Sequence, residues 1–242
     1  AGISNMGQLA TYLIQNVRTD GFSKLELHEW EQIKKRLVIE KKGLEEALQD
    51  SGDSIGKSLL REIIQQTWSC ISSDEQKLLL DISNNLDPTG FVRYFTNFKN
   101  SKTEVIHIIT TNYDHLIEWS ASSCGWRIWD GFDEGPIGSP LSVSELSNRM
   151  KSVSMVGRRP VTSKHPHLRI YKPHGSLSWF RLPDGQIRKI QGVGNHLLPM
   201  LRKVQITPTI VTPGIGKYLE THKEPYNMVL SEMKHVLDNS KA

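Results

Sequence analysis

Cysteines, long apolar segments and a leader sequence are scarce or lacking in this chain. Only Cys70 and Cys124 are cysteines among its 242 residues, and there is no CxxC pair. Two cysteines cannot build a disulfide scaffold or a four-cysteine zinc ribbon, and such low cysteine use is typical of a reducing cytoplasm. No apolar run approaches the ~18 residues of a membrane span, and the start AGISNMGQLATYL lacks the basic residues and cleavage site of a signal peptide. These absences predict a soluble, cytoplasmic protein with no membrane partner.

The composition is that of an ordinary globular protein. Hydrophobic residues make up 37% and charged residues 23%, which excludes global disorder. The length predicts a single domain over 1–242, mainly helical over 1–100 and with an α/β core over 101–242. Residues 1–100 carry 12 Lys and Arg against 14 Asp and Glu, whereas residues 101–242 carry 18 against 12. This positive excess favours an anionic ligand such as a nucleotide but is too small to indicate DNA binding, and ordinary solvated surfaces also carry such an excess.

Apolar residues recur at helical spacing in the first hundred residues. Helices are expected over residues 9–17, 27–37, 55–64, 78–82 and 91–98. Ser54 is the expected cap of the third helix, and the turn signal Asn85-Leu86-Asp87-Pro88 separates the last two. The apolar stripes predict a packed core.

The pattern changes at residue 104. Residues 105–110, Val-Ile-His-Ile-Ile-Thr, are rich in β-branched side chains with little alternation, which predicts a strand buried on both faces of a parallel sheet. We expect further strands at 168–171 and 209–211, helices at 115–121, 142–150 and 225–237, and loops through the rest of the Gly-, Pro- and Ser-rich region 130–163. The predicted fold class is α/β, a Rossmann-like open parallel sheet with a helical insertion or cover.

Each expected strand ends in residues suited to chemistry. The first runs into TTNYD, the second into Lys-Pro-His-Gly-Ser at 172–176, and the third into Thr-Pro-Gly at 212–214. Ligands bind outside the carboxyl ends of parallel strands, so neighbouring strands would bring Asn112, Asp114 and His174 to one crevice. The helix after TTNYD would favour a phosphate nearby. Alternatively, Asn112 and Asp114 cap that helix and His174 is a turn histidine.

Two segments resemble the central motifs of the sirtuin-like family, in the bacterial form found in antiviral defence systems. They are TTNYDHLIEW at 110–119 and YKPHGSLSW at 171–179. Gly131-Phe132-Asp133 resembles a loop between these motifs, and Ala1-Gly2-Ile3-Ser4 resembles the end of the family's glycine-rich phosphate loop. The resemblance implies a sirtuin-like fold whose first strand precedes residue 1 and whose last nucleotide-binding strands follow Ala242. Because the zinc ribbon of the protein-deacylating sirtuins is absent, it points to NAD hydrolysis rather than lysine deacylation.

The resemblance also implies a set of site residues, with NAD as the substrate and no metal. In the family, an Asn after the strand and a His before a Gly flank the nicotinamide ribose, which makes Asn112 and His174 the catalytic candidates. The candidates for NAD binding are Gly2, Thr111, Asp114, Gly175 and Ser176. The implied products are nicotinamide and ADP-ribose, and the implied role is an antiphage defence effector that depletes NAD.

The residue types suit this reaction. Breaking the nicotinamide–ribose bond passes through an oxocarbenium-like state, and nicotinamide departs as a neutral group, so no strong acid is needed. Asn112 has a donor and an acceptor that can orient a water or a ribose hydroxyl. His174 titrates near neutrality and can take a proton from either. Asp114 is expected to fix the loop or bind ribose, and Thr111 and Ser176 to donate to phosphate or ribose.

Two other function classes remain open. Metal-assisted phosphoester or nucleic-acid cleavage would use ligand types present at His107, Asn112, Asp114, His115 and His174, although their spacing is not that of a familiar metal site. A nucleotide- or nucleic-acid-binding scaffold subunit would use the basic segment at Arg158, Arg159, Lys164, His165 and Arg169, although few aromatic residues lie there for base stacking. Solvated surface loops also carry such clusters. From the resemblance, the expected partners are a second copy of this chain and an ATPase of the DNA-translocase type.

Overall fold

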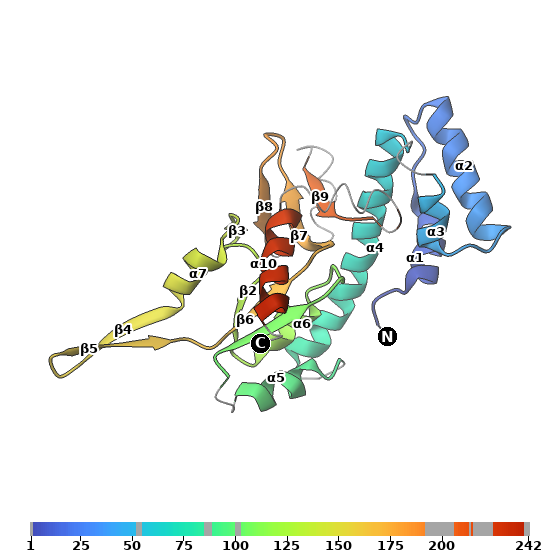
Figure 1. The fold of residues 1–242 in the computed structure, drawn as a ribbon. Coiled ribbons are helices and arrows are strands. Elements are labelled where there is room, and N and C mark those ends of the chain that lie inside the picture. The colour runs from blue at the N-terminus through green and yellow to red at the C-terminus, as the bar shows by residue number, and fades with distance from the viewer. Residues whose placement is uncertain are drawn as a thin grey trace.

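The computed structural model describes residues 2–51, 55–84, 89–99, 103–191, 206–212, 214 and 225–239. In chain order these residues form α1 (Met6–Asn16), α2 (Lys24–Val38), α3 (Leu44–Gln49), α4 (Lys57–Ser83), α5 (Phe91–Lys99), β1 (Val105–Ile109), α6 (Leu116–Ser123), β2 (Arg127–Trp129), β3 (Ile137–Gly138), α7 (Val143–Arg149), β4 (Lys151–Val156), β5 (Arg159–Lys164), β6 (His167–Tyr171), β7 (Gly175–Arg181), β8 (Ile187–Ile190), β9 (Thr207–Ile210) and α10 (Tyr226–Asn239) (Figure 1). The protein is thus a mixed α/β structure with a helical first part, as predicted. None of the described helices combines the length and the hydropathy needed to cross a membrane.

Helix α4 is a single helix of 27 residues that joins the helical part to the sheets (Figure 1). Its first turns bury Leu59 and Ile63 among α1, α2 and α3, while Trp68 further along packs against the sheets. The expectation of separate helices over 55–64 and 78–82 is therefore wrong. The apolar stripe that predicts a helix is interspersed with polar residues between residues 64 and 78, because α4 buries polar residues where it passes between the two parts. These residues are Gln65, Gln66, Thr67, Ser69 and Ser72. Gly56 is the N-cap, whereas the predicted cap Ser54 and the turn at 85–88 lie outside the described residues.

The parallel sheet has the strand order β1-β6-β2. The central strand β6 is buried at four of its five residues. Strand β1 occurs where it was predicted, but only Ile106 in it is buried, so the expected burial on both faces is wrong. The reason is that β1 lies at the edge of this sheet within the described structure. Helices α5 and α6 cover one face through a cluster that includes Phe95 and Ala121.

A second, antiparallel sheet has the order β3-β8-β7-β9. The expectation that residues 209–211 join the parallel sheet is wrong, because β9 pairs with β7 in this second sheet. Strand β7 was not predicted, and all its residues except the last are buried. Trp129, Tyr171 and Trp179 pack together where the two sheets meet, and α10 covers this core with Tyr226.

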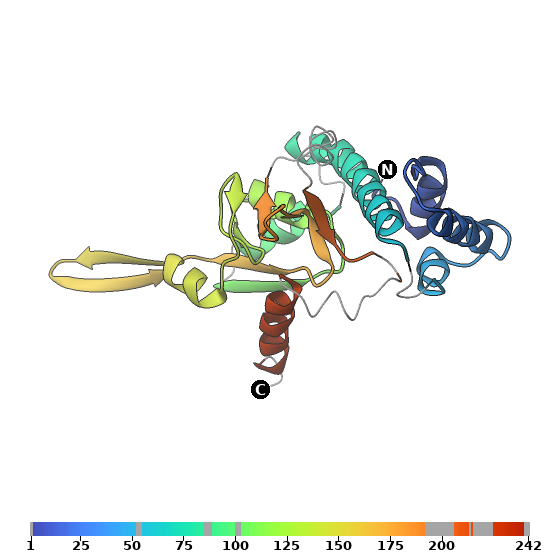
Figure 2. The same ribbon diagram turned by 90° about the horizontal axis from the view of Figure 1, so that it is seen from above.

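The region 130–163 contains the expected helix, α7, but also a hairpin that was expected to be loop. Strands β4 and β5 pair antiparallel from Lys151↔Lys164 to Val156↔Arg159. Both views show the hairpin projecting away from the sheets (Figures 1 and 2). Its Gly, Pro and Ser content masked short β-branched stretches that alternate with polar residues.

Glu26 fixes the start of α2 against the start of α4. Its carboxylate accepts hydrogen bonds from the backbone and hydroxyl of Ser23, both at 2.9 Å, and from the amides of Ser58 at 2.9 Å and Leu59 at 3.4 Å. The bonds from Ser23, together with those from Ser58 and Leu59, lower the pKa of Glu26 from 4.5 to about 2. A carboxylate at two helix N-termini satisfies amides that have no partner within their helices.

We therefore expect Glu26→Gln to destabilise the protein at neutral pH and to lose this effect in acid. Because the pKa is depressed in the folded state, the contribution of Glu26 is complete above pH 4.5 and disappears as the pH falls through about 2. Urea unfolding across this window should show the gap between wild type and variant closing. Glu31→Gln, at an exposed surface pair with Lys34, is the control. A gap that stays constant with pH would contradict the assignment.

Candidate active site

The carboxyl ends of β1 and β6 lie side by side. The two strands pair in parallel with Ile109 opposite Tyr171, and the Thr110 amide donates to the Tyr171 carbonyl at 3.0 Å. The segments that follow therefore leave the sheet together. A cavity of about 490 Å³ lies there, and its lining includes Thr111, Asn112, Asp114 and His174. The structure thus brings together these four of the seven site residues named from the sequence.

The N-terminal segment closes part of the same cavity. Ile3 and Ser4 line it, and Met6, Leu9 and Ile71 add apolar walls. Ser4 is held in place by Asp74, whose carboxylate accepts from the Ser4 amide at 3.0 Å and from its hydroxyl at 2.5 Å. Gly2 immediately precedes these residues and is exposed, but it is not one of the lining residues.

The polar groups in this cavity differ in their freedom to bind a ligand. Asn112 is exposed, and its side chain has no hydrogen-bond partner within the described part of the chain; only its amide donates, to the Thr110 hydroxyl at 3.1 Å. Asp114 is buried and accepts from the amide of Leu116, the first residue of α6, at 3.2 Å, while the N-cap of that helix is His115. Burial raises the pKa of Asp114, while Lys172 and the Leu116 amide oppose that rise.

A buried lysine holds the loop that carries Asn112. Lys172 is fully buried, and its ammonium lies 2.7 Å from Glu118 Oε1. It also donates to the carbonyls of Asp114 and, at 3.5 Å, Tyr113. The Tyr113 hydroxyl in turn donates to the Val211 carbonyl at 2.6 Å, and burial raises its pKa. The sequence pattern gave no role to Lys172 or Glu118, although a lysine that directly follows a buried strand needs a partner.

Gly175 and Ser176 lie outside the lining of this cavity. Gly175 has a φ of +90°, and a Cβ there would lie 2.2 Å from the Thr209 carbonyl oxygen. It permits the close approach of β7 and β9. Ser176 is fully buried and its hydroxyl lies 2.9 Å from His115 Nε2, so it belongs to a second cluster.

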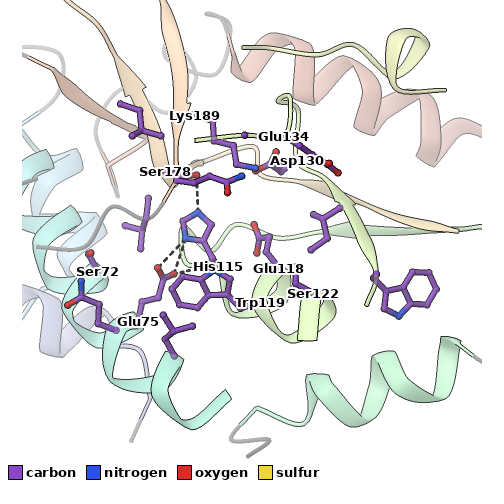
Figure 3. A pocket seen from close by; sticks show the side chains of 18 of the residues that line it. Ser72, Glu75, His115, Glu118, Trp119, Ser122, Asp130, Glu134, Ser178 and Lys189 are labelled. Carbon is purple, nitrogen blue, oxygen red and sulfur yellow. Dashed lines mark hydrogen bonds and ion pairs between the residues drawn. The ribbon is translucent and has the colours of Figure 1, made fainter. Parts of the chain in front are cut away.

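This second cluster borders a larger cavity of about 670 Å³ between α4, α6 and the sheets (Figure 3). Glu75 Oε1 lies 3.1 Å from His115 Nδ1, and His115 Nε2 lies 2.9 Å from the Ser178 hydroxyl. Glu75 also accepts from the His115 amide. Burial alone would raise the pKa of Glu75, but the charge and hydrogen bonds of His115 outweigh it and lower that pKa. Across the cavity, Lys189 pairs with Asp130 at 2.8 Å.

The acid, imidazole and hydroxyl have the order of a hydrolase triad, but acyl transfer also needs donors for an oxyanion. Two amides next to the Ser178 hydroxyl in the chain are engaged, since Leu177 donates to the Tyr113 carbonyl at 3.0 Å and Ser178 to the Ser176 hydroxyl at 3.5 Å. His115 is further shared between two serines. We therefore assign this cluster to the positioning of the TTNYD loop, from which His115 follows directly.

The metal interpretation finds little geometric support in the described residues. His107 Nδ1 lies 3.1 Å from the Tyr171 hydroxyl, and both ring nitrogens of His115 have the partners given above. Among the residues that the structure describes, no three His, Cys, Asp or Glu side chains gather closely enough to share a metal ion.

No family model matches the chain, and no curated protein is significantly similar to it.

Proposed function

We propose that this chain is a sirtuin-like domain of Rossmann type that hydrolyses NAD to nicotinamide and ADP-ribose. The observation that carries the proposal is the meeting of Asn112 and His174 at the ends of two adjacent parallel strands, in one cavity with Ile3 and Ser4. Three of the four segments whose sequences resemble the family's motifs therefore meet at this cavity, whereas the fourth, Gly131-Phe132-Asp133, is not among its lining residues. A cavity of about 490 Å³ is also within the usual range for small-molecule sites.

The reaction assigns a role to each polar group. The side-chain amide of Asn112, which has no hydrogen-bond partner among the described residues, orients the attacking water or a ribose hydroxyl. His174 takes the proton that this water or hydroxyl oxygen releases. The departing nicotinamide needs no acid, so the protein has to hold the ribose and stabilise the positive charge that develops on it. Asp114 is a buried residue of the cavity lining and holds the loop by accepting from the Leu116 amide. Depletion of NAD by this reaction is a defence effector's role, and the proposal extends to a homo-oligomer with an ATPase partner of the DNA-translocase type.

The test is incubation of the complete protein with NAD, with and without a genetically adjacent partner, followed by chromatography of nicotinamide and ADP-ribose. Asn112→Ala and His174→Ala are each expected to reduce release by at least ~10²-fold. Asn148→Ala and His28→Ala, at exposed positions remote from the cavity, control for the residue types removed. NAD that binds without being cleaved in any state would refute hydrolysis and leave a sensing domain.

A further inference from the structure

The hairpin of β4 and β5, residues 151–164 and here called the arm, has no packing role in the described structure. Every residue of β5 is exposed, as are all residues of β4 except Ser152. The strands have six residues each, which gives a reach of about 20 Å. Gly157, with a φ of +63°, begins the two-residue turn at the tip and allows the chain to reverse tightly.

The arm exposes apolar side chains without a partner in the described part of the protein. Val153, Met155 and Val156 are 68%, 64% and 66% exposed. A two-stranded ribbon alone in water is only marginally stable, and exposed apolar side chains add nothing to it there. An arm of this kind gains stability when something covers it.

The charge of the arm identifies what could cover it. The sequence KSVSMVGRRPVTSK contains four cations, Lys151, Arg158, Arg159 and Lys164, and no acidic residue. Of these four cations, only Lys164 makes an ion pair with a described residue, an exposed pair with Glu104 at 3.3 Å. The two arginines lie at the tip, where a long side chain reaches furthest from the protein.

The two faces of the arm differ. Opposed residues of an antiparallel pair point to the same side, so Val153 and Thr162 share a face with Met155 and Pro160. The other face carries the hydroxyls of Ser152, Ser154 and Ser163 together with Val161 opposite Ser154, and Val156 opposite Arg159 nearest the tip. The first face is therefore apolar toward the tip and has Lys151 and Lys164 at its base, while the second offers serine hydroxyls and Arg159 as donors for phosphate oxygens.

We propose that the arm binds duplex DNA, with its tip in a groove, its cations on the flanking phosphates and Met155 and Pro160 against the base edges. Grooves of B-form DNA admit a two-stranded ribbon, and apolar wedges including Met and Pro are inserted by minor-groove binders. Protein interfaces are enriched in aromatic residues, Met and Arg and depleted of Lys and Ser. The arm shares the Met and Arg but has no aromatic residue, two lysines and three serines, so its positive charge without any acidic residue decides for a polyanion. Single strands require stacking aromatics, and the major groove of duplex RNA is too narrow and deep to read. This inference is independent of NAD hydrolysis.

The experiment measures fluorescence anisotropy of a labelled DNA duplex with the complete protein, in the absence of NAD. The arm variant is Lys151→Gln/Arg158→Gln/Arg159→Gln, and the control is Lys24→Gln/Lys35→Gln/Lys57→Gln, which removes the same charge from exposed helical positions. Raising the salt from about 50 to 200 mM weakens DNA binding by a certain factor for each protein. If three phosphate contacts are lost, this factor should be about 40 times smaller for the arm variant than for wild type. The control should follow wild type. Met155→Ser should weaken binding without changing the salt dependence, because it removes no charge.

Several results would overturn the proposal. One is the absence of duplex DNA binding, and another is equal binding by the arm variant and its control. Equal or tighter binding of single-stranded DNA, duplex RNA or anionic phospholipid vesicles through the arm would assign it to a different partner. All substituted side chains are exposed, so the variants test binding rather than folding.

Discussion

Replacing Lys172 with methionine is expected to lower the free energy of unfolding by about 3–5 kcal/mol, because it leaves the buried Glu118 carboxylate without its counter-charge. Lys172 is fully buried and Glu118 is 91–93% buried, with the two charges 2.7 Å apart. The Glu118 oxygens receive no well-directed hydrogen bond within the described structure, so charge attraction to Lys172 is their main compensation. The carbonyls of Tyr113 and Asp114 lose a donor in the same step.

Equilibrium unfolding in urea measures this loss of stability. Two further variants serve as an exposed-pair control and as a test of rescue. Lys164→Met removes a lysine from the exposed pair with Glu104 and should cost less than about 1 kcal/mol. Lys172→Met/Glu118→Leu should recover much of the stability, since replacing both members of a buried pair is far less costly than removing one. A single variant as stable as the Lys164→Met control would show that the pair does not hold this loop.

The meeting of Asn112 and His174 at one site could be predicted from the sequence, because it depends on a few local signals. A β-branched run followed by TTNYD, and a second run followed by Lys-Pro-His-Gly, define two strand ends, and neighbouring parallel strands bring them together. Asn112 and His174 lie at one cavity for this reason. The edge position of β1 could not be predicted, because strand order depends on contacts between distant segments.

The position of Ser176 could have been predicted had β7 been recognised. Successive residues of a strand point to opposite faces, so Ser176 and Ser178, two positions apart, point to the same side, toward His115. His174 precedes this strand and lies at the other cavity. Gly175, which pairs with Ile210 of β9, lies between His174 at the smaller cavity and Ser176 in the His115 cluster.

Gly175→Ala is the second change with a large expected effect, because the glycine meets two demands at once. Its φ of +90° costs an alanine about 1–2 kcal/mol. In addition, a Cβ would lie 2.2 Å from the Thr209 carbonyl oxygen and 3.0 Å from the Ile210 Cα, both backbone atoms that cannot rotate away. Relieving such overlap costs about 1–3 kcal/mol more, so a total loss of roughly 2–5 kcal/mol is expected.

Gly185→Ala separates the two costs, because Gly185 has a similar φ of +84° but open space around its Cβ position. Only the conformational cost should appear there, and the difference between the two variants in urea unfolding measures the overlap with β9. The displaced strand would also move His174, whose carbonyl accepts from the Val211 amide at 2.8 Å. Nicotinamide release per folded molecule should therefore fall in Gly175→Ala and stay unchanged in Gly185→Ala. Equal losses of stability in both variants would mean that the approach of β7 and β9 is looser than described, and that Gly175 is required only for its backbone conformation.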